Sequence, residues 1–379
     1  MSDASPSLLR DSIGSRSICG LSERINGVFP EFEQKLFENS ALENLHLLGL
    51  NERIQQVRES LKQYLPNDFS QASSILIRAL GSEIPQDNLD GVDLSSAHGF
   101  IVLPQCEFIS HYGLQHFDLA MNALLEMTKR FSSEGAIRAF IDNHHEKTYE
   151  QLEKWLSHDN VHVRRLVSEG TRPRLPLFSR LPRYIKDPAP VILLLDKLKD
   201  DSHLYVRRSV ANNLNDISKD NPKVVTDLLL EWSVDASSER LWLIKHALRT
   251  LLKQGNQAAL SILGFKPVPD LLVGHFTLDK SEMKLGEELK ISAGLSCESE
   301  KSHPIMIDYV VYHKKANGKL SPKVFKWGQK IISKKTPLEL GKKHSIKKIS
   351  TRKYYAGEHE VHLQVNGEVL AVCHFTLQL

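Results

Sequence analysis

The sequence predicts a mainly α-helical protein, a solenoid of stacked helical repeats, followed by a small all-β sandwich. Apolar residues recur at three- and four-residue spacing up to about Gly264, and one helical motif returns with a period near 40 residues. After about Pro267, short runs of β-forming residues alternate with turn signals. The 379 residues are enough for two or three domains with an ample core.

The helical part is divided by connections rich in Pro, Asn, Asp and Gly. Three segments within it have the clearest helical periodicity: Val191–Lys199, Val224–Trp232 and Leu241–Lys253. The motif V-R-R-L-V, which begins at Val163, recurs as V-R-R-S-V 43 residues later, and a looser copy begins at Leu243. This period predicts a HEAT-like array, in which basic residues at equivalent repeat positions would line one face.

Six runs in the C-terminal part are rich in β-formers: Leu272–Leu278, Leu289–Leu295, Ile305–His313, Val324–Trp327, Glu360–Val365 and Val369–Leu377. Asn317-Gly318 and Asn366-Gly367 fall between such runs and predict tight hairpins. About seven strands in roughly a hundred residues indicate an immunoglobulin-like sandwich. Cys297 and Cys373 are not expected to form the disulfide of that fold, because Cys373 lies in the last strand.

These patterns divide the chain into a flexible lead-in over residues 1–20, a helical domain over 21–265 and a β-domain over 266–379. No apolar run approaches the roughly 18 residues of a membrane helix, and the N-terminus lacks the features of a secretory signal. The four cysteines have no C-x-x-C spacing, which fits a reducing compartment. We therefore expect a cytoplasmic monomer that does not bind a membrane.

Charge is distributed unevenly along the chain. Between Lys314 and Lys353 there are fourteen basic residues and one acidic residue, Glu339, which is a net charge of +13. Since the whole chain carries +3, the remainder carries −10. Such a block marks either a solvated loop or a surface that binds a polyanion. Apolar and aromatic residues among the lysines favour a folded basic surface.

In the stretch from His158 to Pro176, Glu169 is the only acidic residue among four arginines, and it comes just before a helix-ending Gly170. The arginines are Arg164, Arg165, Arg172 and Arg174. An isolated acid in such a cluster costs stability unless the site uses it, which predicts a carboxylate kept ionised within a surface that binds a polyanion.

Two other acids are candidates for the same site. Asp216 lies on the helix that carries Arg207 and Arg208, and Glu134 lies at an expected helix start with Arg138 one turn later. Taken singly, Asp216 is most simply a surface charge and Glu134 an acid favoured by the helix dipole. Together on one basic concave face, the three acids could bind a cation within a polyanion.

Other chemistries find little support in the sequence. The histidine pairs lack a third ligand at suitable spacing, so no metal site is expected. There is no glycine-rich phosphate loop and no nucleophile elbow, so we expect no nucleotide cofactor and no serine nucleophile.

The helical repeats resemble the HEAT-like DNA alkylation repair glycosylases in two motifs, D-N-V-H-V-R-R-L-V-S-E-G-T-R-P-R-L-P and V-R-R-S-V-A-N-N-L-N-D-I-S-K-D-N-P. The resemblance covers nearly the whole chain and is to the AlkC branch, which adds an Ig-like domain to AlkD-like repeats. It implies that Glu169, Glu134 and Asp216 are the active-site carboxylates. The chain departs from the expected patterns at Leu177, where an aromatic residue is expected, and at Asn212 and Asn215, where AlkD-like proteins carry an aromatic and an arginine.

The resemblance implies a monofunctional DNA glycosylase of base excision repair, which needs neither metal nor cofactor. It would remove cationic bases such as 3-methyladenine and 3-methylcytosine from double-stranded DNA without flipping them, unlike most enzymes that act on bases. We expect DNA contacts from nine residues: Arg138, Arg164, Arg165, Arg172, Arg174, Arg207, Arg208, Lys245 and Arg249. The alternative is a non-catalytic HEAT-repeat scaffold that binds DNA or an acidic protein.

Overall fold

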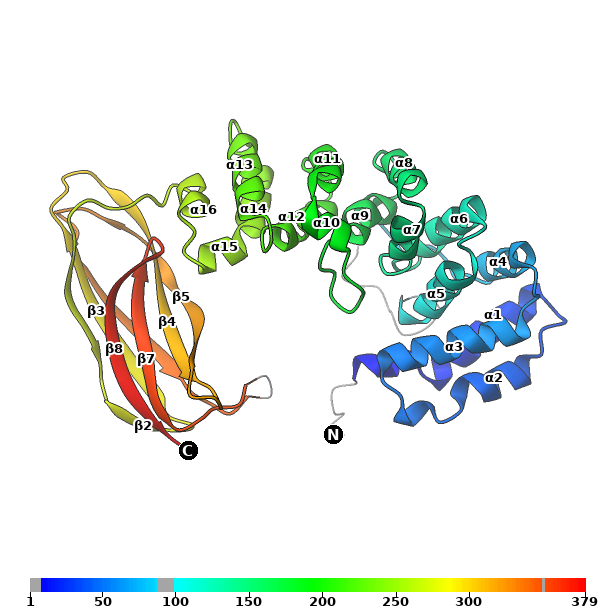
Figure 1. Cartoon of the computed structure of the whole chain (residues 1–379), viewed down its shortest axis with the longest axis horizontal. Coiled ribbons are helices and arrows are strands. Elements are labelled where there is room, and N and C mark those ends of the chain that lie inside the picture. The colour runs from blue at the N-terminus through cyan, green and yellow to red at the C-terminus, as the bar shows by residue number, and fades with distance from the viewer. Residues whose placement is uncertain (1–7, 87–98, 350–351) are drawn as a thin grey trace. The chain divides into compact units, whose positions relative to one another are not determined.

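Helices precede strands in the computed structural model, which describes residues 8–86, 99–349 and 352–379 (Figure 1). The α-helices are α1 Ser15–Val28, α2 Gln34–Leu42, α3 Leu50–Tyr64, α4 Phe69–Arg78, α5 Leu103–Tyr112, α6 Phe117–Thr128, α7 Ile137–Asn143, α8 His145–Trp155, α9 Val161–Gly170, α10 Pro182–Lys186, α11 Ala189–Leu198, α12 Leu204–Ile217, α13 Pro222–Trp232, α14 Ser238–Ala247, α15 Arg249–Lys253 and α16 Gln257–Ile262. Short 3₁₀ helices are η1 Leu9–Ser12, η2 Leu45–Leu47 and η3 Gly99–Val102. Within the described part of the chain, no helix is long and apolar enough to cross a membrane.

The chain forms two compact units, each of which takes two segments of sequence. One consists of Met1–Asn221 with Ser237–Ala247, and the other of Pro222–Ala236 with Leu248–Leu379. The change from helix to strand that we expected near residue 265 lies between α16 and β1. Residues 1–7 of the expected lead-in lie outside the described residues. The expectation of a flexible segment is wrong for residues 15–20, because they begin α1 and bury Ile18.

The repeat identified in the sequence is a structural repeat. Val163 and Val206 are each the third residue of their helices, α9 and α12. In the first unit α12 packs against both α9 and α14, while α11 packs against α9 and α12 from the other layer. The side chain of Asn160 caps α9 by accepting the backbone N–H of His162 at 2.9 Å. The helices that carry the repeated motif thus pack side by side, within the mainly α-helical region that the sequence predicted.

The helix expected over Leu241–Lys253 is divided into α14 and α15 at Leu248. The apolar periodicity continues across the break, since Ile244, Leu248 and Leu251 are all buried. The spacing of apolar residues is the same on both sides of the break, so the sequence shows no sign of it. The prediction of a single helix was therefore wrong.

The C-terminal strands form two sheets of a sandwich. The strands are β1 Leu271–Leu278, β2 Glu282–Lys284, β3 Glu288–Cys297, β4 His303–Lys314, β5 Leu320–Ile332, β6 Leu338–Ser345, β7 Gly357–Val365 and β8 Glu368–Gln378. One sheet has the order β1-β3-β6 and the other β2-β8-β7-β4-β5. Residues from both sheets, such as Ile291, Val311 and Phe375, share one buried core. The Ig-like sandwich is confirmed, and all four cysteines of the chain are free.

Two strands were missed by the sequence prediction. β2 has only three residues, too few for a visible alternation. β6 begins with alternating Leu338 and Leu340 but continues through Gly341 into lysines. β5 and β6 are the outermost strands of their sheets, where lysine commonly prevents pairing with another chain. Much of the +13 segment is thus folded on these two edges, as expected for a basic surface rather than a loop.

The turn between β7 and β8 joins the sandwich to the helices of its own unit. Asn366 and Gly367 both have positive φ, 45° and 81°, as the Asn-Gly pattern predicts. The Asn366 side chain donates to the carbonyl oxygen of Lys266 at 2.7 Å and accepts the backbone N–H of Met306 at 2.7 Å. A Cβ atom on Gly367 would lie 2.5 Å from the carbonyl oxygen of Gly255, so only glycine fits this approach.

Substitution of Gly367 by alanine is therefore expected to lower the free energy of unfolding by about 2–4 kcal/mol, from backbone strain and the collision with Gly255. Gly318 offers a matched control, because it also follows Asn and has φ of 77° but has open space around its Cβ position. Gly318→Ala should cost only the strain of about 1–2 kcal/mol. Denaturant unfolding of both variants measures the difference, and equal losses would show that the close approach is unimportant.

Candidate active site

A polar stripe on α12 faces the C-terminal half of α9. Ser209, Asn213 and Asp216 follow one another at four- and three-residue spacing, so they lie on one face of the helix. All three are buried. Asn213 donates to the carbonyl oxygen of Ser168 at 2.8 Å and to the hydroxyl of Thr171 at 3.1 Å. The stripe thus holds the end of α9, where Glu169 lies, against α12.

Glu169 is the centre of the site. Its Oε1 atom accepts a hydrogen bond from Arg172 Nη1 at 2.5 Å and lies 3.5 Å from Arg165 Nη2. Its Oε2 atom accepts the hydroxyl of Ser209 at 2.6 Å. Both carboxylate oxygens are therefore engaged by groups from α9, α12 and the turn after α9, which fixes the orientation of the side chain.

The two arginines extend this contact to the other predicted acids. Arg165 Nη1 donates to Glu134 Oε2 at 2.6 Å, and Arg172 Nε donates to Asp216 Oδ2 at 2.7 Å. The three carboxylates that the sequence singled out thus lie in one network with Arg165 and Arg172. Glu134 itself lies in the turn before α7 rather than in its first helical turn.

Ionic balance within the network depends on one more cation. Three carboxylates and two guanidiniums carry a net charge of −1. Lys219 supplies the missing positive charge through a 2.7 Å contact with Asp216 Oδ1, and its side chain is 40% exposed. Among the acids, the side chain of Glu134 is 18% exposed, that of Glu169 6% and that of Asp216 2%. Water therefore reaches Glu134 most easily, and Lys219 is the most exposed of the three cations.

Electrostatics keep Glu169 ionised although it is buried. Burial alone would raise the pKa of this carboxyl, but the guanidiniums of Arg165 and Arg172 and the Ser209 hydrogen bond outweigh it and hold the pKa below its usual value. Burial opposes the charge on Arg165 as well, and Glu134 and Glu169 raise its pKa nonetheless. The Arg165 guanidinium also lies 5.1 Å from the ring centre of Tyr205.

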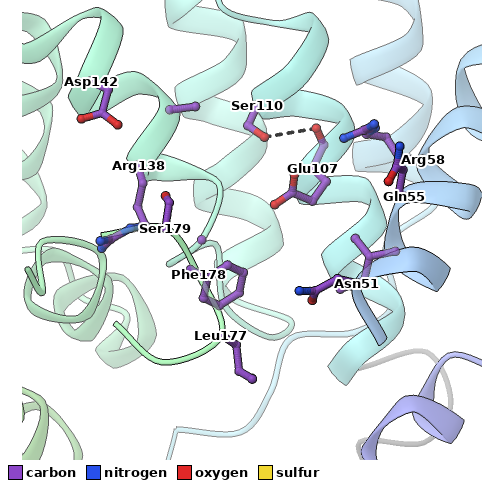
Figure 2. A pocket seen from close by; sticks show the side chains of 13 residues that line it. Asn51, Gln55, Arg58, Glu107, Ser110, Arg138, Asp142, Leu177, Phe178 and Ser179 are labelled. Atoms are coloured by element: carbon purple, nitrogen blue, oxygen red, sulfur yellow. Dashed lines mark hydrogen bonds between the residues drawn. The ribbon is translucent and has the colours of Figure 1, made fainter. Parts of the chain in front are cut away.

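Arg138 holds the backbone at the end of α9, next to the network, and lines a neighbouring pocket of about 480 Å³ (Figure 2). Its Nη1 atom donates to the carbonyl oxygens of Gly170 at 3.0 Å and Arg172 at 2.8 Å, which satisfies the end of α9. Burial lowers the pKa of Arg138 to about 10. The side chain is fully buried, so in this conformation it holds protein backbone instead of offering a surface to DNA.

The first arginine of each V-R-R motif has a structural role that repeats. Arg164 Nη1 donates to the carbonyl oxygens of residues 158 and 159 at 2.8 and 3.0 Å. Arg207 Nη1 makes the equivalent contacts to residues 201 and 202 at 2.5 and 2.9 Å. Arg164 also binds the Asp201 carboxylate through Nε at 2.6 Å and Nη2 at 3.2 Å. These arginines fasten each loop to the helix that follows it.

The remaining basic residues that we expected to contact DNA fall into two groups. Arg174 makes a two-pronged ion pair with Asp220, with both distances 2.7 Å. Arg208 and Lys245 are exposed on α12 and α14, and Arg249 is half-buried at the start of α15. The nine residues are therefore not equivalent: most bind protein groups, while Arg208 and Lys245 are open to solvent.

The sequence analysis missed several residues that build the site. Ser209 and Lys219 each bind a carboxylate of the network directly, and Ser132 donates to Glu134 at 2.7 Å. The four- and three-residue spacing of Ser209, Asn213 and Asp216 within an otherwise apolar helix was the signal available. Among the described residues, no group of three or more His, Cys, Asp or Glu side chains is arranged to hold a metal ion.

Together, the fold and the site define a protein of stacked helical repeats with a buried carboxylate–guanidinium network, joined in one chain to an Ig-like sandwich. Residues 272–379 match the family model described as "Uncharacterised protein YhaZ, C-terminal Ig-like domain". YhaZ of Bacillus subtilis (strain 168) is 34% identical over 362 residues, which are 95% of this chain and 97% of that protein. The structure of Pseudomonas fluorescens alkylpurine DNA glycosylase AlkC, bound to DNA containing an abasic site analog, superposes with a TM-score of 0.89 at 33% identity and covers 98% of this chain and 100% of that one. The chain belongs to the AlkC and YhaZ family.

Replacement of Glu169 by glutamine should destabilise the protein by about 1–3 kcal/mol at pH 7, because the buried Arg172 and the half-buried Arg165 lose their shared partner. The folded-state pKa of Glu169 lies below the ordinary value of 4.5, so the stabilisation is complete above about pH 4.5 and is lost as the pH falls through the folded-state pKa. The difference in unfolding free energy between wild type and Glu169→Gln should therefore shrink in acid.

Chemical denaturation at several pH values between about 3 and 7 measures this difference. Glu150→Gln, an exposed substitution on α8, is the matched control and should change stability by less than about 0.5 kcal/mol at each pH. A difference for Glu169→Gln that does not vary with pH would contradict the depressed pKa.

Proposed function

We propose that this protein is a monofunctional DNA glycosylase of base excision repair. It hydrolyses the N-glycosidic bond of cationic alkylated bases, 3-methyladenine and 3-methylcytosine, in double-stranded DNA without flipping the base. The observation that carries the proposal is the meeting of Glu134, Glu169 and Asp216 in one network with two arginines. The similarity to AlkC, solved with DNA containing an abasic site analog, supports it.

The chemistry follows from the charge of the substrate. A methylated base that is already cationic is a good leaving group, and its departure leaves positive charge on the deoxyribose. A carboxylate fixed beside the sugar stabilises that charge as it develops, without any cost of reorientation during the reaction. The carboxylate stabilises the transition state at the sugar, so the protein need not enclose the base in a pocket.

We assign a different part to each acid. Glu169, held between two guanidiniums and a hydroxyl, provides the fixed negative charge. Glu134, the most exposed carboxylate of the three, would orient or deprotonate the attacking water. Asp216 holds Arg172 and is itself paired with Lys219.

Phosphate binding falls to the exposed basic residues. Arg208 and Lys245 are free to meet the DNA backbone, whereas Arg138, Arg165 and Arg172 position carboxylates and the end of α9. Lysines on β5 of the sandwich would add contacts that hold the duplex without reading its sequence. Bending the DNA costs on the order of 1–6 kcal/mol, which such contacts can offset.

The decisive assay measures release of free base from DNA that carries 3-methyladenine, 3-methylcytosine or 7-methylguanine. Wild type should release the first two under single-turnover conditions, and Glu169→Gln should be slower by about 100- to 1,000-fold, because a fixed charge at the transition state is lost. Its affinity for DNA should persist or rise, since one negative charge near the phosphates is gone.

Asp201→Asn is the matched control, because the Asp201 side chain is also only 6% exposed and paired with an arginine but lies outside the network. It should retain the wild-type rate of excision at saturating enzyme. If wild type releases no base but binds DNA, the chain is a scaffold instead of an enzyme. Equal slowing of both variants would mean that Glu169 acts only through stability.

The exposed lysines of β5 lead to a separate prediction about the salt dependence of DNA binding. Lys323→Gln, Lys326→Gln and Lys330→Gln together remove three exposed charges from this edge strand. If these lysines contact phosphate, the slope of log affinity against log salt should become shallower by roughly one to three units. Fluorescence anisotropy with duplex DNA at several salt concentrations measures the slope.

Lys147→Gln, Lys154→Gln and Lys186→Gln make a control variant with the same change in net charge on exposed helical positions. Its salt slope should stay within error of wild type. Identical slopes for all three proteins would remove the β-domain from the DNA interface.

A further inference from the structure

An apolar trough of about 510 Å³ lies between α8 and α11, outside the network. It is lined by one turn of each helix and by the residue before α11 that faces them: His145, Glu146, Tyr149, Glu150, Asp187, Ala189, Pro190 and Leu193. The Tyr149 hydroxyl donates to the carbonyl oxygen of Pro190 at 3.0 Å, which ties the two walls together. All of these residues belong to one compact unit, so the trough is a fixed feature of its surface.

The apolar residues of the trough are open to solvent. Leu193 is 64% exposed, whereas the next two residues of α11, Leu194 and Leu195, are buried in the core. Ala189, one turn before Leu193, is exposed as well. A pocket for a small molecule encloses most of its ligand, while a shallow apolar surface with a polar rim is typical of a site that binds another protein. The exposure of Leu193 therefore favours a macromolecular partner.

The rim of the trough carries negative charge. Glu146, Glu150 and Asp187 are all exposed, and the described residues that line the trough include no lysine or arginine. Burial and the nearby Arg183 guanidinium lower the pKa of His145, so its ring is neutral at pH 7 and does not offset the acids. An apolar floor between three carboxylates is complementary to an apolar side chain with cationic neighbours.

Charge and position exclude DNA as the occupant of the trough. The phosphates of a duplex would be repelled by the three carboxylates of the rim. Figure 1 shows α8 and α11 in one row of helices, and α9 and α12, which carry most of the network, in the other row of the same unit. No residue of the network lines the trough, so a partner bound there would leave the network uncovered.

We infer that the trough binds a short segment of another protein, in which a leucine-sized apolar side chain is flanked by lysine or arginine. The apolar side chain packs against Leu193, and its cationic neighbours pair with Glu146 and Glu150 on one wall and Asp187 on the other. A cation beside Glu150 also lies near the ring of Tyr149, which adds attraction. The interaction is independent of the proposed glycosylase activity, because it uses a separate set of residues.

A short fluorescein-labelled peptide of leucine and lysine tests the apolar contact, by fluorescence anisotropy with the full-length protein. Wild type should bind this peptide, and Leu193→Ser should bind it about tenfold more weakly or worse, because the apolar contact is lost. Leu47→Ser is the matched control, since Leu47 is 70% exposed but lies in η2, and it should bind as wild type does. Both variants should keep the wild-type melting temperature, because both side chains lie at the surface.

Reversal of charge tests the rim. Glu146→Lys combined with Glu150→Lys should weaken binding of the lysine peptide about tenfold and should strengthen binding of a peptide in which glutamate replaces lysine. Glu31→Lys combined with Glu43→Lys makes the same change in net charge at exposed positions outside the trough. This control should change neither affinity by more than about twofold, because distant surface charges are screened by salt.

The inference is refuted if wild type binds neither peptide, if Leu193→Ser binds the lysine peptide as tightly as wild type, or if the two charge-reversed variants behave alike. Sedimentation velocity tests a different occupant: a wild-type dimer that Leu193→Ser dissolves would assign the trough to a second copy of this chain and overturn the inference. Base release from alkylated DNA should be equal for wild type and Leu193→Ser. If wild type releases no base, the proposed function fails, while the peptide assays still decide what the trough binds.

Discussion

The site depends on the pairing of one buried carboxylate with two guanidiniums. Glu169 is removed from water between α9 and α12, and a charge in that position destabilises a protein by several kcal/mol if a partner is missing. Arg165 and Arg172 supply that pairing, and each then requires a second acid, which Glu134 and Asp216 provide. The hydroxyl of Ser209 and the carbonyl contacts of Arg138 complete the arrangement. The contacts that offset the cost of burying the Glu169 charge also fix the orientation of its side chain.

Two successive repeats share the same scaffold contacts but contribute different residues to the network. Arg164 and Arg207 make the same carbonyl contacts in successive repeats, so this feature belongs to the fold. The second arginines differ, because Arg165 joins the network and Arg208 is exposed. At the positions 43 residues after Glu169 and Arg172, the chain has Asn212 and Asn215. The network thus takes Arg165, Glu169 and Arg172 from one repeat and its end, and Asp216 from α12 of the next.

The sequence contains enough information to predict the fold class, because helical and strand periodicities and two Asn-Gly turns are local signals. It also points to Glu169, since an acid among arginines is conspicuous at any burial, whereas Glu134 and Asp216 were candidates that the family resemblance brought together with it. The pairing of those arginines could not be read from the sequence: nothing local distinguishes Arg164, which binds loop carbonyls, from Arg165, which binds carboxylates. The break at Leu248 was missed because the spacing of buried apolar residues continues across it. Strand β6 was missed because lysines interrupt its alternation of apolar and polar residues.

The central claim is that two arginines hold Glu169 ionised within the protein. Titration of its side-chain carboxyl by ¹³C NMR tests this most directly, with Glu169→Gln used to assign the signal. The account predicts a titration midpoint below 4.5 in wild type, and a midpoint that rises when Arg172 is replaced by glutamine. A wild-type midpoint at or above 4.5 would contradict it, because burial would then outweigh the two guanidiniums.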